Sequence, residues 1–302
     1  MDWNDFTVHL NQHLKQVEQP EIQIISTHEV TGGDSHQAYQ LHTADKNFFL
    51  KLSPAQNLPM LQTEMHNLNA ILQSQTITCP QPYATGTYQQ HAWLLMEFIP
   101  LTSQGDDFER GKSLAFMHHQ INRQAKPFGW FEDNYIGLSL QHNQWHLDWI
   151  SFYGQQRLKP QLELALLRGA SQSLYQSGMT VIEQLPHWFQ DYQPKASLLH
   201  GDLWGGNSAF DNSGEPIVFD PACYYGDRET DIAMSELFGG YTAEFYAGYN
   251  DLFPLDQGYS QRKPLYNLYH ILNHFNLFGG HYEQQAQKII DHLIKQIPPL
   301  NR

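Results

Sequence analysis

Cysteine is scarce in this sequence: Cys79 and Cys223 are the two cysteines among 302 residues. Two cysteines cannot build the disulfide framework of a small secreted domain, and they suit a reducing compartment. Basic residues are also few, because 17 Lys and Arg stand against 31 Asp and Glu, which gives a formal net charge of −14. Nucleic-acid-binding surfaces are usually basic, so we expect no nucleic-acid partner.

Long apolar runs are missing as well. No stretch approaches the roughly 18 apolar residues that a membrane-spanning helix requires. The polar and acidic beginning, MDWNDFTVHLNQHLKQ, lacks the basic and apolar regions of a signal peptide. We therefore expect no membrane association and a cytoplasmic location. The pattern G-x-x-x-x-G-K-[ST] is absent too, which excludes a Walker-type nucleotide site.

What the sequence does contain is the motif HGDLWGGN at residues 200–207, followed by Asp220. Asp202, Asn207 and Asp220 are the residue types of a kinase-type phosphotransferase. One Asp orients and deprotonates the attacking hydroxyl, while the Asn and the second Asp hold Mg²⁺ against ATP. Asp and Asn also serve as ordinary turn residues, but all three at this spacing favour the catalytic interpretation.

The segment between Asn207 and Asp220 is expected to fold as a β-hairpin. Two short apolar runs in it flank the turn residues 211–214, a pattern typical of a hairpin. We expect this hairpin to bring its two ends close enough to share one metal ion. Carboxylate and amide oxygens are hard ligands, which suit Mg²⁺.

Residues further upstream fit the binding of ATP. Gly32, Gly33 and Ser35 lie in a turn between two strand-like segments, where backbone N–H groups can approach phosphate without interference from Cβ. Lys51 lies on the apolar strand NFFLKLS, and the segment after it has helical periodicity and one acid, Glu64. A strand Lys paired with a helix Glu is the expected arrangement for contacting the phosphates. The alternative is a surface lysine that extends to water.

A change of pattern near Pro100 predicts two lobes. The apolar strand HAWLLMEFIP ends there, and we expect backbone groups of Glu97 and Ile99 to hold adenine at an interlobe hinge. An opening helix, strands, one helix and two more strands predict a small β-rich ATP-binding lobe over residues 1–98. Helical periodicity over residues 99–302 predicts a larger catalytic and substrate-binding lobe. The predicted fold class is therefore α+β.

The order of these features resembles the protein-kinase-like fold. The strings HGDLWGGN and DPACYYGDRETD are more specific, and together with FGWFEDNYIG and WHLDWISFYGQQRL they resemble the fructosamine kinase (ketosamine 3-kinase) family. Aminoglycoside and choline kinases share the HGD-Asn-Asp pattern, but they do not usually show the Trp-Gly-Gly of this chain. The resemblance covers nearly the whole chain, from about Thr27 to the last helices.

The resemblance implies a role for each residue of the motif. Asp202 would be the catalytic base, Asn207 and Asp220 the Mg²⁺ ligands, and Lys51 the phosphate-binding lysine with Glu64 as its partner. It also implies an ATP-dependent kinase acting on the 3-hydroxyl of fructosamines, ribulosamines or erythrulosamines. The substrate would be a small ketosamine or a glycated lysine on a protein. The unstable 3-phosphate would then free the amine, which is a deglycation repair.

Other residues have structural or substrate interpretations. His200 is expected to hold the geometry of the catalytic loop, and Asp231 to accept backbone N–H groups of that loop, as in this fold. Trp204 follows the base by two residues, so we expect it to contact the substrate. Aromatic residues at such spacings are more often core than ligand contacts. The further substrate candidates are Trp130, Tyr135 and Asp227.

Two other functions remain open from the sequence. One is a kinase of the same fold that acts on another small alcohol, such as an aminoglycoside, choline or a sugar. The other is a nucleotide-binding module without turnover. The presence of the base, both metal ligands and the lysine together argues against the second.

Overall fold

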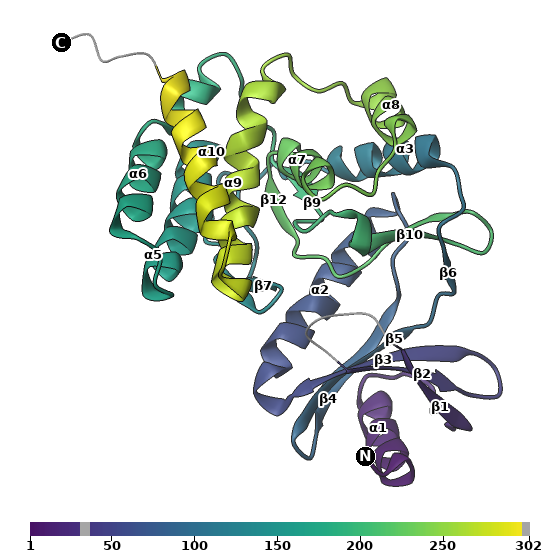
Figure 1. The fold of residues 1–302 in the computed structure, drawn as a ribbon. Helices are drawn as coiled ribbons and strands as arrows, with labels where there is room; N and C mark the ends of the chain where they lie inside the picture. Colours follow the sequence, from purple (N-terminus) through teal and green to yellow (C-terminus); the bar gives the residue numbers. More distant parts are fainter. Residues whose placement is uncertain (31–36, 298–302) are drawn as a thin grey trace. The chain divides into compact units, whose positions relative to one another are not determined.

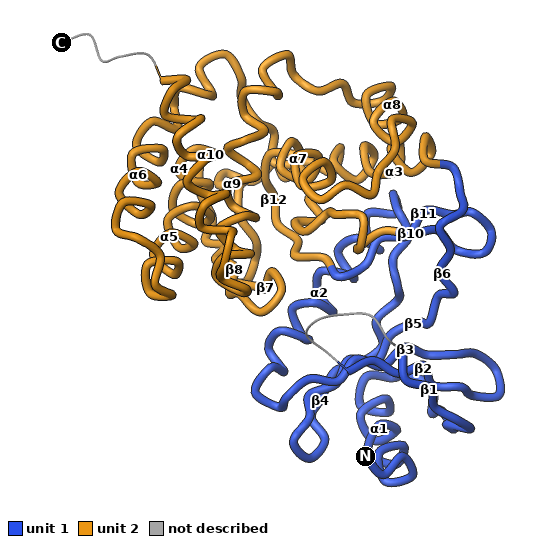
Figure 2. Tube along the Cα trace, in the orientation of Figure 1, with its two compact units in different colours: residues 1–106, 209–220 blue, residues 107–208, 221–302 orange. Residues whose placement is uncertain are grey.

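The structure is a computed structural model that describes residues 1–30 and 37–297. Packing divides the chain into two units, one made of residues 1–106 and 209–220 and the other of residues 107–208 and 221–302 (Figure 2). The turn expected to bind phosphate, with Gly32, Gly33 and Ser35, lies outside the described residues.

The first unit is built on an antiparallel five-stranded sheet with the order β1-β2-β3-β5-β4 (Figure 1). The strands are β1 (Ser26–Val30), β2 (Gln37–His42), β3 (Asn47–Pro54), β4 (Pro82–Tyr88) and β5 (His91–Glu97). Two helices, α1 (Trp3–Gln16) and α2 (Leu58–Ser74), accompany it, with a short 3₁₀ turn at Ala55–Asn57. Phe6, Leu10 and Leu14 recur every fourth residue of α1 and are buried in the core against the sheet.

A second, three-stranded sheet in this unit contains the predicted hairpin. Its order is β11-β10-β6, and the strands are β6 (Leu101–Thr102), β10 (Ser208–Asp211) and β11 (Pro216–Val218). The carboxylate of Asp211 accepts hydrogen bonds from the backbone N–H groups of Ser213 and Glu215, at 2.8 and 2.9 Å, and so closes the turn. The hairpin is therefore confirmed. It packs with the first unit, whereas chain order alone had assigned it to the second lobe.

The second unit is mostly helical. Its helices are α3 (Asp107–His118), α4 (Trp149–Phe152), α5 (Lys159–Leu167), α6 (Gln172–Glu183), α7 (Glu229–Leu237), α8 (Ala243–Leu252), α9 (Tyr259–Phe278) and α10 (Tyr282–Gln296). Its strands are β7 (Asn134–Ile136), β8 (Ser139–Gln141), β9 (Ser197–Leu199) and β12 (Tyr224–Gly226). Shorter helical turns are Tyr153–Leu158, Leu185–Phe189 and Gly205–Asn207. Leu265, Leu268 and Leu272 recur at helical spacing on α9 and are buried, and this helix packs against α5, α7 and α10 (Figure 1).

Helices α3 and α8 approach each other closely because each carries a glycine at the contact. A Cβ on Gly111 would lie 2.0 Å from the carbonyl oxygen of Phe245, and a Cβ on Gly248 would lie 2.0 Å from that of Phe108. This close packing holds His118, the last residue of α3, beside Tyr249 of α8. The division into a β-rich first part and a helical second part is as predicted, while the lobe boundary after residue 98 stays a prediction. Among the described helices, none has the length and apolar character needed to span a membrane.

Candidate active site

Residues 200–207 form a loop that leaves β9 and turns sharply at Gly201. Strand β9 pairs antiparallel with β12, and the carbonyl of His200 accepts a hydrogen bond from Ala222 N at 2.8 Å. Gly201 has a φ of 85°, a left-handed conformation that side chains disfavour, and a Cβ there would lie 2.0 Å from the Ala222 carbonyl oxygen. The glycine of the HGD motif is thus required by the turn that presents Asp202.

Asp231, in the first turn of α7, anchors this turn. Its Oδ2 accepts a hydrogen bond from His200 N at 2.7 Å, and its Oδ1 accepts one from Gly201 N at 2.9 Å. These are the backbone contacts expected of Asp231 from the sequence. Burial by itself raises the pKa of Asp231, but hydrogen bonds from His118 and from the loop outweigh that effect, so its pKa lies below the ordinary value. Asp231 is therefore a buried, ionised acceptor.

Asp202 and Asn207 are joined within the loop. The Nδ2 of Asn207 donates to the carbonyl oxygen of Asp202 at 2.9 Å and to its Oδ2 at 3.3 Å. His200 is fully buried, and its Nδ1 accepts from Asp202 N at 3.3 Å, which agrees with a structural role. Because the amide nitrogen of Asn207 is used inside the loop, its Oδ1 is the atom suited to a cation.

The two glycines of the Trp-Gly-Gly string each make a close contact. A Cβ on Gly206 would lie 2.2 Å from the ring of Trp204, and a Cβ on Gly205 would lie 2.7 Å from the Cα of Gly240. Both positions therefore require a residue without a side chain. The indole of Trp204 rests over Gly206 and is 41% exposed, so this large apolar surface can be reached by a ligand.

In the first unit, Lys51 is surrounded by two carboxylates. Its Nζ lies 2.5 Å from Oε1 of Glu64 on α2, and it also contacts Oδ1 of Asp220. Lys51 is 8% exposed on the central strand β3, where alternate neighbours face the core. Burial alone would lower the pKa of Lys51, but the two nearby carboxylates outweigh burial, so the pKa of Lys51 lies above its ordinary value. Burial raises the pKa of Glu64, and the positive charge of Lys51 opposes that rise.

The Lys51 cluster therefore carries one cation and two carboxyl groups. The side chain of Glu64 is 12% exposed, whereas that of Asp220 is 49% exposed. Asp220 also has a φ of 56°, the left-handed region that is uncommon outside glycine and often marks functional sites. The half-exposed carboxylate is the member of this cluster that can take a further partner, and a hard divalent cation suits it chemically.

The hinge candidates lie at the end of β5. Glu97 is its last residue; Glu97 N donates to Gln81 O at 2.8 Å, and Gln81 N donates to Glu97 Oε2 at 3.3 Å. Ile99 follows the strand and is half-buried. Their contact with adenine stays a prediction.

The remaining substrate candidates differ in exposure. Trp130 is 5% exposed and packs 5.4 Å from the ring of Tyr225, which is the core position that such aromatics usually take. Tyr135, on β7, is half-buried.

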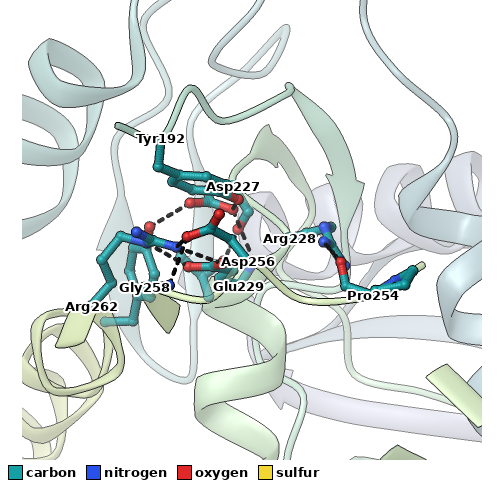
Figure 3. A network of polar contacts seen from close by, with 10 residues as sticks. Tyr192, Asp227, Arg228, Glu229, Pro254, Asp256, Gly258 and Arg262 are labelled. Carbon is teal, nitrogen blue, oxygen red and sulfur yellow. Dashed lines mark hydrogen bonds and ion pairs between the residues drawn. The ribbon is translucent and has the colours of Figure 1, made fainter. Parts of the chain in front are cut away.

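Asp227, the remaining substrate candidate, is fully buried within a network of polar contacts (Figure 3). Its carboxylate accepts hydrogen bonds from the hydroxyls of Tyr192 at 2.9 Å and Tyr266 at 2.5 Å, and from Glu229 N at 3.1 Å. These donors occupy both oxygens, so Asp227 is a structural acceptor.

Several buried polar residues were not expected from the sequence. Arg262 donates from Nε and Nη2 to both oxygens of Glu229, at 2.8 and 2.9 Å, and from Nη2 to Asp256 at 2.7 Å (Figure 3). Burial raises the pKa of Glu229 to about 7, the neighbouring Asp227 adds to this rise, and Arg262 opposes it. His118, at the end of α3, contacts Asp231. No local pattern reveals these partners, because they come from distant parts of the chain.

Within residues 1–30 and 37–297, no group of three or more His, Cys, Asp or Glu is placed to hold a metal ion.

Comparison with known proteins identifies the family. The family model of fructosamine kinase matches residues 6–296. The chain belongs to the fructosamine kinase family. A probable ketoamine kinase of Vibrio vulnificus is 39% identical over 288 residues, which cover 94% of this chain and 98% of that protein. The chloroplastic protein-ribulosamine 3-kinase of Arabidopsis thaliana is 39% identical over 277 residues, which cover 91% of this chain and 84% of that protein.

Solved structures agree with this assignment. A Haemophilus somnus protein described as a fructosamine-3-kinase superposes with a TM-score of 0.83 at 27% identity, covering 94% of this chain and 96% of that chain. An aminoglycoside phosphotransferase superposes with a TM-score of 0.60 at 14% identity, covering 97% and 99%, which shows the fold alone. The kinase-like fold, the family and the class of enzyme predicted from the sequence are confirmed: the chain is an ATP-dependent kinase of the ketosamine-phosphorylating family.

Proposed function

We propose that this kinase transfers the γ-phosphoryl group of ATP to the 3-hydroxyl of a ketosamine, with Asp202 as the base. The observation that supports this most is the construction of the loop. Asp231 holds the backbone on the N-terminal side of Asp202, and Asn207 holds Asp202 itself. A carboxylate fixed in this way keeps its orientation toward the attacking hydroxyl.

In this proposal, Asp202 accepts a hydrogen bond from the substrate hydroxyl and takes its proton as the oxygen attacks phosphorus. General bases in such positions contribute about 10²–10⁴ to the rate. His200 does not take the proton, because it is buried and its Nδ1 is already used by Asp202 N. The exposed indole of Trp204 is proposed as a wall for the sugar, with Tyr135 as a further candidate.

Lys51 is proposed to bind the α- and β-phosphates of ATP, and Glu64 to hold the lysine side chain toward them. We propose Asn207 and Asp220 as the ligands of Mg²⁺, since an amide oxygen and a half-exposed carboxylate are hard donors that fit this ion. When bound, the metal offsets charge on the phosphates. The other nucleotide contacts proposed from the sequence are Gly32, Gly33 and Ser35 for phosphate, and Glu97 and Ile99 for adenine.

The amine carrier is proposed to be a small amine or a lysine on a protein, and spontaneous loss of the 3-phosphate would restore the free amine. The name of the Arabidopsis relative, protein-ribulosamine 3-kinase, favours a ribulose-derived substrate. The cytoplasmic location stays a prediction, since that relative is chloroplastic.

The test of the base is Asp202→Asn, with Asp251→Asn as the matched control on the exposed surface of α8. We expect kcat to fall by about 10²-fold or more in the first variant, with KM for ATP nearly unchanged. The control should behave like the wild type. Near wild-type turnover by Asp202→Asn would show that another group takes the proton.

A further inference from the structure

A line of buried hydrogen bonds connects α8 and α3 to the catalytic loop. His118 is the last residue of α3 and is fully buried. Its Nε2 lies 3.1 Å from Asp231 Oδ2, and its Nδ1 lies 2.7 Å from the hydroxyl oxygen of Tyr249 on α8. That hydroxyl lies 3.1 Å from Nη1 of Arg228, just before α7. The line therefore runs from Arg228 through Tyr249 and His118 to Asp231.

The protons in this line can be assigned from its two ends, because the ionised Asp231 can only accept and Arg228 can only donate. Arg228 can only donate, so the oxygen of Tyr249 accepts from it. His118 Nε2 therefore carries the proton that it donates to Asp231, and in the neutral imidazole Nδ1 then accepts the hydroxyl proton of Tyr249. Burial lowers the pKa of His118, which favours this neutral form. The tautomer of His118 is thus determined at both ends.

The beginning of the line is firmly held. Besides Tyr249, Arg228 donates to the carbonyl oxygen of Phe253 at 2.6 Å. It also donates to that of Pro254 at 2.5 Å (Figure 3). Its guanidinium also lies 3.6 Å from the ring centre of Phe253. The residues on either side, Asp227 and Glu229, are fixed by the network of Figure 3. The cation that starts the line therefore has little freedom to move.

The other end of the line is the carboxylate that shapes the loop. Asp231 accepts from His118 Nε2, His200 N and Gly201 N. The last two contacts act on the backbone immediately before Asp202. A buried carboxylate that loses one of three donors reorients or draws in water to replace it, because an unsatisfied charged oxygen is costly. Such a rotation would carry His200 N and Gly201 N with it.

We propose that His118 is a positioning residue for catalysis, acting on Asp202 through Asp231. This inference rests on the proposed role of Asp202 as the base. A shift of the base by about 1 Å costs on the order of 10²-fold in rate. Lys51, proposed to bind the phosphates of ATP, lies elsewhere in the chain, so we expect the loss to fall mainly on kcat.

Two amide variants separate positioning from packing. In His118→Gln the terminal amide nitrogen reaches about as far along the side chain as Nε2, so the donor to Asp231 is kept. In His118→Asn the amide ends near the place of Nδ1, so that donor is lost. We expect kcat to fall by about 10–100-fold in the Asn variant and by a few-fold at most in the Gln variant. His292→Asn, on the exposed face of α10, is the control for the same substitution elsewhere.

A second readout needs no substrate. Amide hydrogen exchange at Gly201 N should be slow in the wild type and in His118→Gln, and at least about 10-fold faster in His118→Asn, because exchange follows local opening. Equal kcat and equal exchange in the two amide variants would overturn the proposal. If the wild type turns over no ketosamine, the proposed function fails, while the exchange rates still decide the role of His118.

Tyr249→Phe is the second variant, in case His118→Asn does not fold. It removes one oxygen from the line and leaves the ring in place. We expect faster exchange at Gly201 N and a lower kcat than in the wild type, both smaller in extent than in His118→Asn. Wild-type values for both quantities in Tyr249→Phe would overturn the link from Arg228 through Tyr249.

Discussion

Replacing Lys51 by Met would leave Glu64 as a buried carboxyl group without its cation. The two acids at Lys51 differ in solvent contact: the side chain of Glu64 is 12% exposed and that of Asp220 is 49% exposed. Asp220 can keep its charge in water, but Glu64 cannot. We therefore assign the cost of the substitution to Glu64. Breaking a buried ion pair by removing one partner typically costs about 3–5 kcal/mol.

Protonation sets an upper limit to this cost. The ordinary pKa of a glutamate carboxyl group is 4.5, which lies 2.5 pH units below pH 7. Protonating the group at pH 7 therefore costs about 3 kcal/mol. In the variant the folded-state pKa of Glu64 rises further above its unfolded value, so a proton is taken up on folding. The penalty therefore grows as the pH rises from about 4.5 and is below about 1 kcal/mol at pH 5.

Urea unfolding at pH 5 and pH 7 measures this difference. We expect Lys51→Met to lose at most about 3 kcal/mol of unfolding free energy relative to the wild type at pH 7, and much less at pH 5. The double variant Lys51→Met/Glu64→Gln, which contains no acid at position 64, should recover most of the loss at pH 7. An equal loss at both pH values, or no recovery in the double variant, would refute the assignment to Glu64.

Two further predictions concern the catalytic loop. In Asp231→Asn, an amide NH₂ group replaces one of the two oxygens that accept from His200 N and Gly201 N, so one backbone N–H loses its acceptor. We expect a loss of about 1–3 kcal/mol of unfolding free energy in urea, together with a lower kcat. Gly201→Ala combines a φ of 85° with a Cβ 2.0 Å from Ala222 O, so thermal unfolding should show a larger loss than in Gly169→Ala, where φ is 95° but no atom lies within 4 Å. The control should lose about 1–2 kcal/mol from backbone strain alone. Equal losses at the two glycines would contradict the close contact.

Much of the candidate site follows from short-range sequence signals. The hairpin between Asn207 and Asp220 is set by its own turn residues, and the glycine of HGD is required by the local backbone conformation. The Lys51–Glu64 pair follows from an apolar strand next to an amphipathic helix, each with one charge. Such features depend on neighbours in the sequence, so a single chain is enough to predict them.

Other features depend on segments that meet only in the folded chain. Asp227 lies in a polar run that reads as exposed, but the hydroxyls of Tyr192 and Tyr266, 35 and 39 residues away, bury and satisfy it. The contact between His118 and Asp231 joins residues 113 positions apart. The pairing of β10 with β6 places the hairpin in the first unit, which chain order does not indicate. Long-range packing of this kind leaves no periodic signal in the sequence.

The most direct test of the proposed activity is Mg²⁺-dependent release of ADP from ATP with a matched pair of substrates. One sample contains a ribulose–lysine adduct, and the other contains the same concentrations of free lysine and ribulose. We predict turnover with the adduct alone, lost in Asp202→Asn and retained in Asp251→Asn. ATP binding without turnover on the adduct, but with turnover on an aminoglycoside, choline or a free sugar, would contradict the ketosamine assignment.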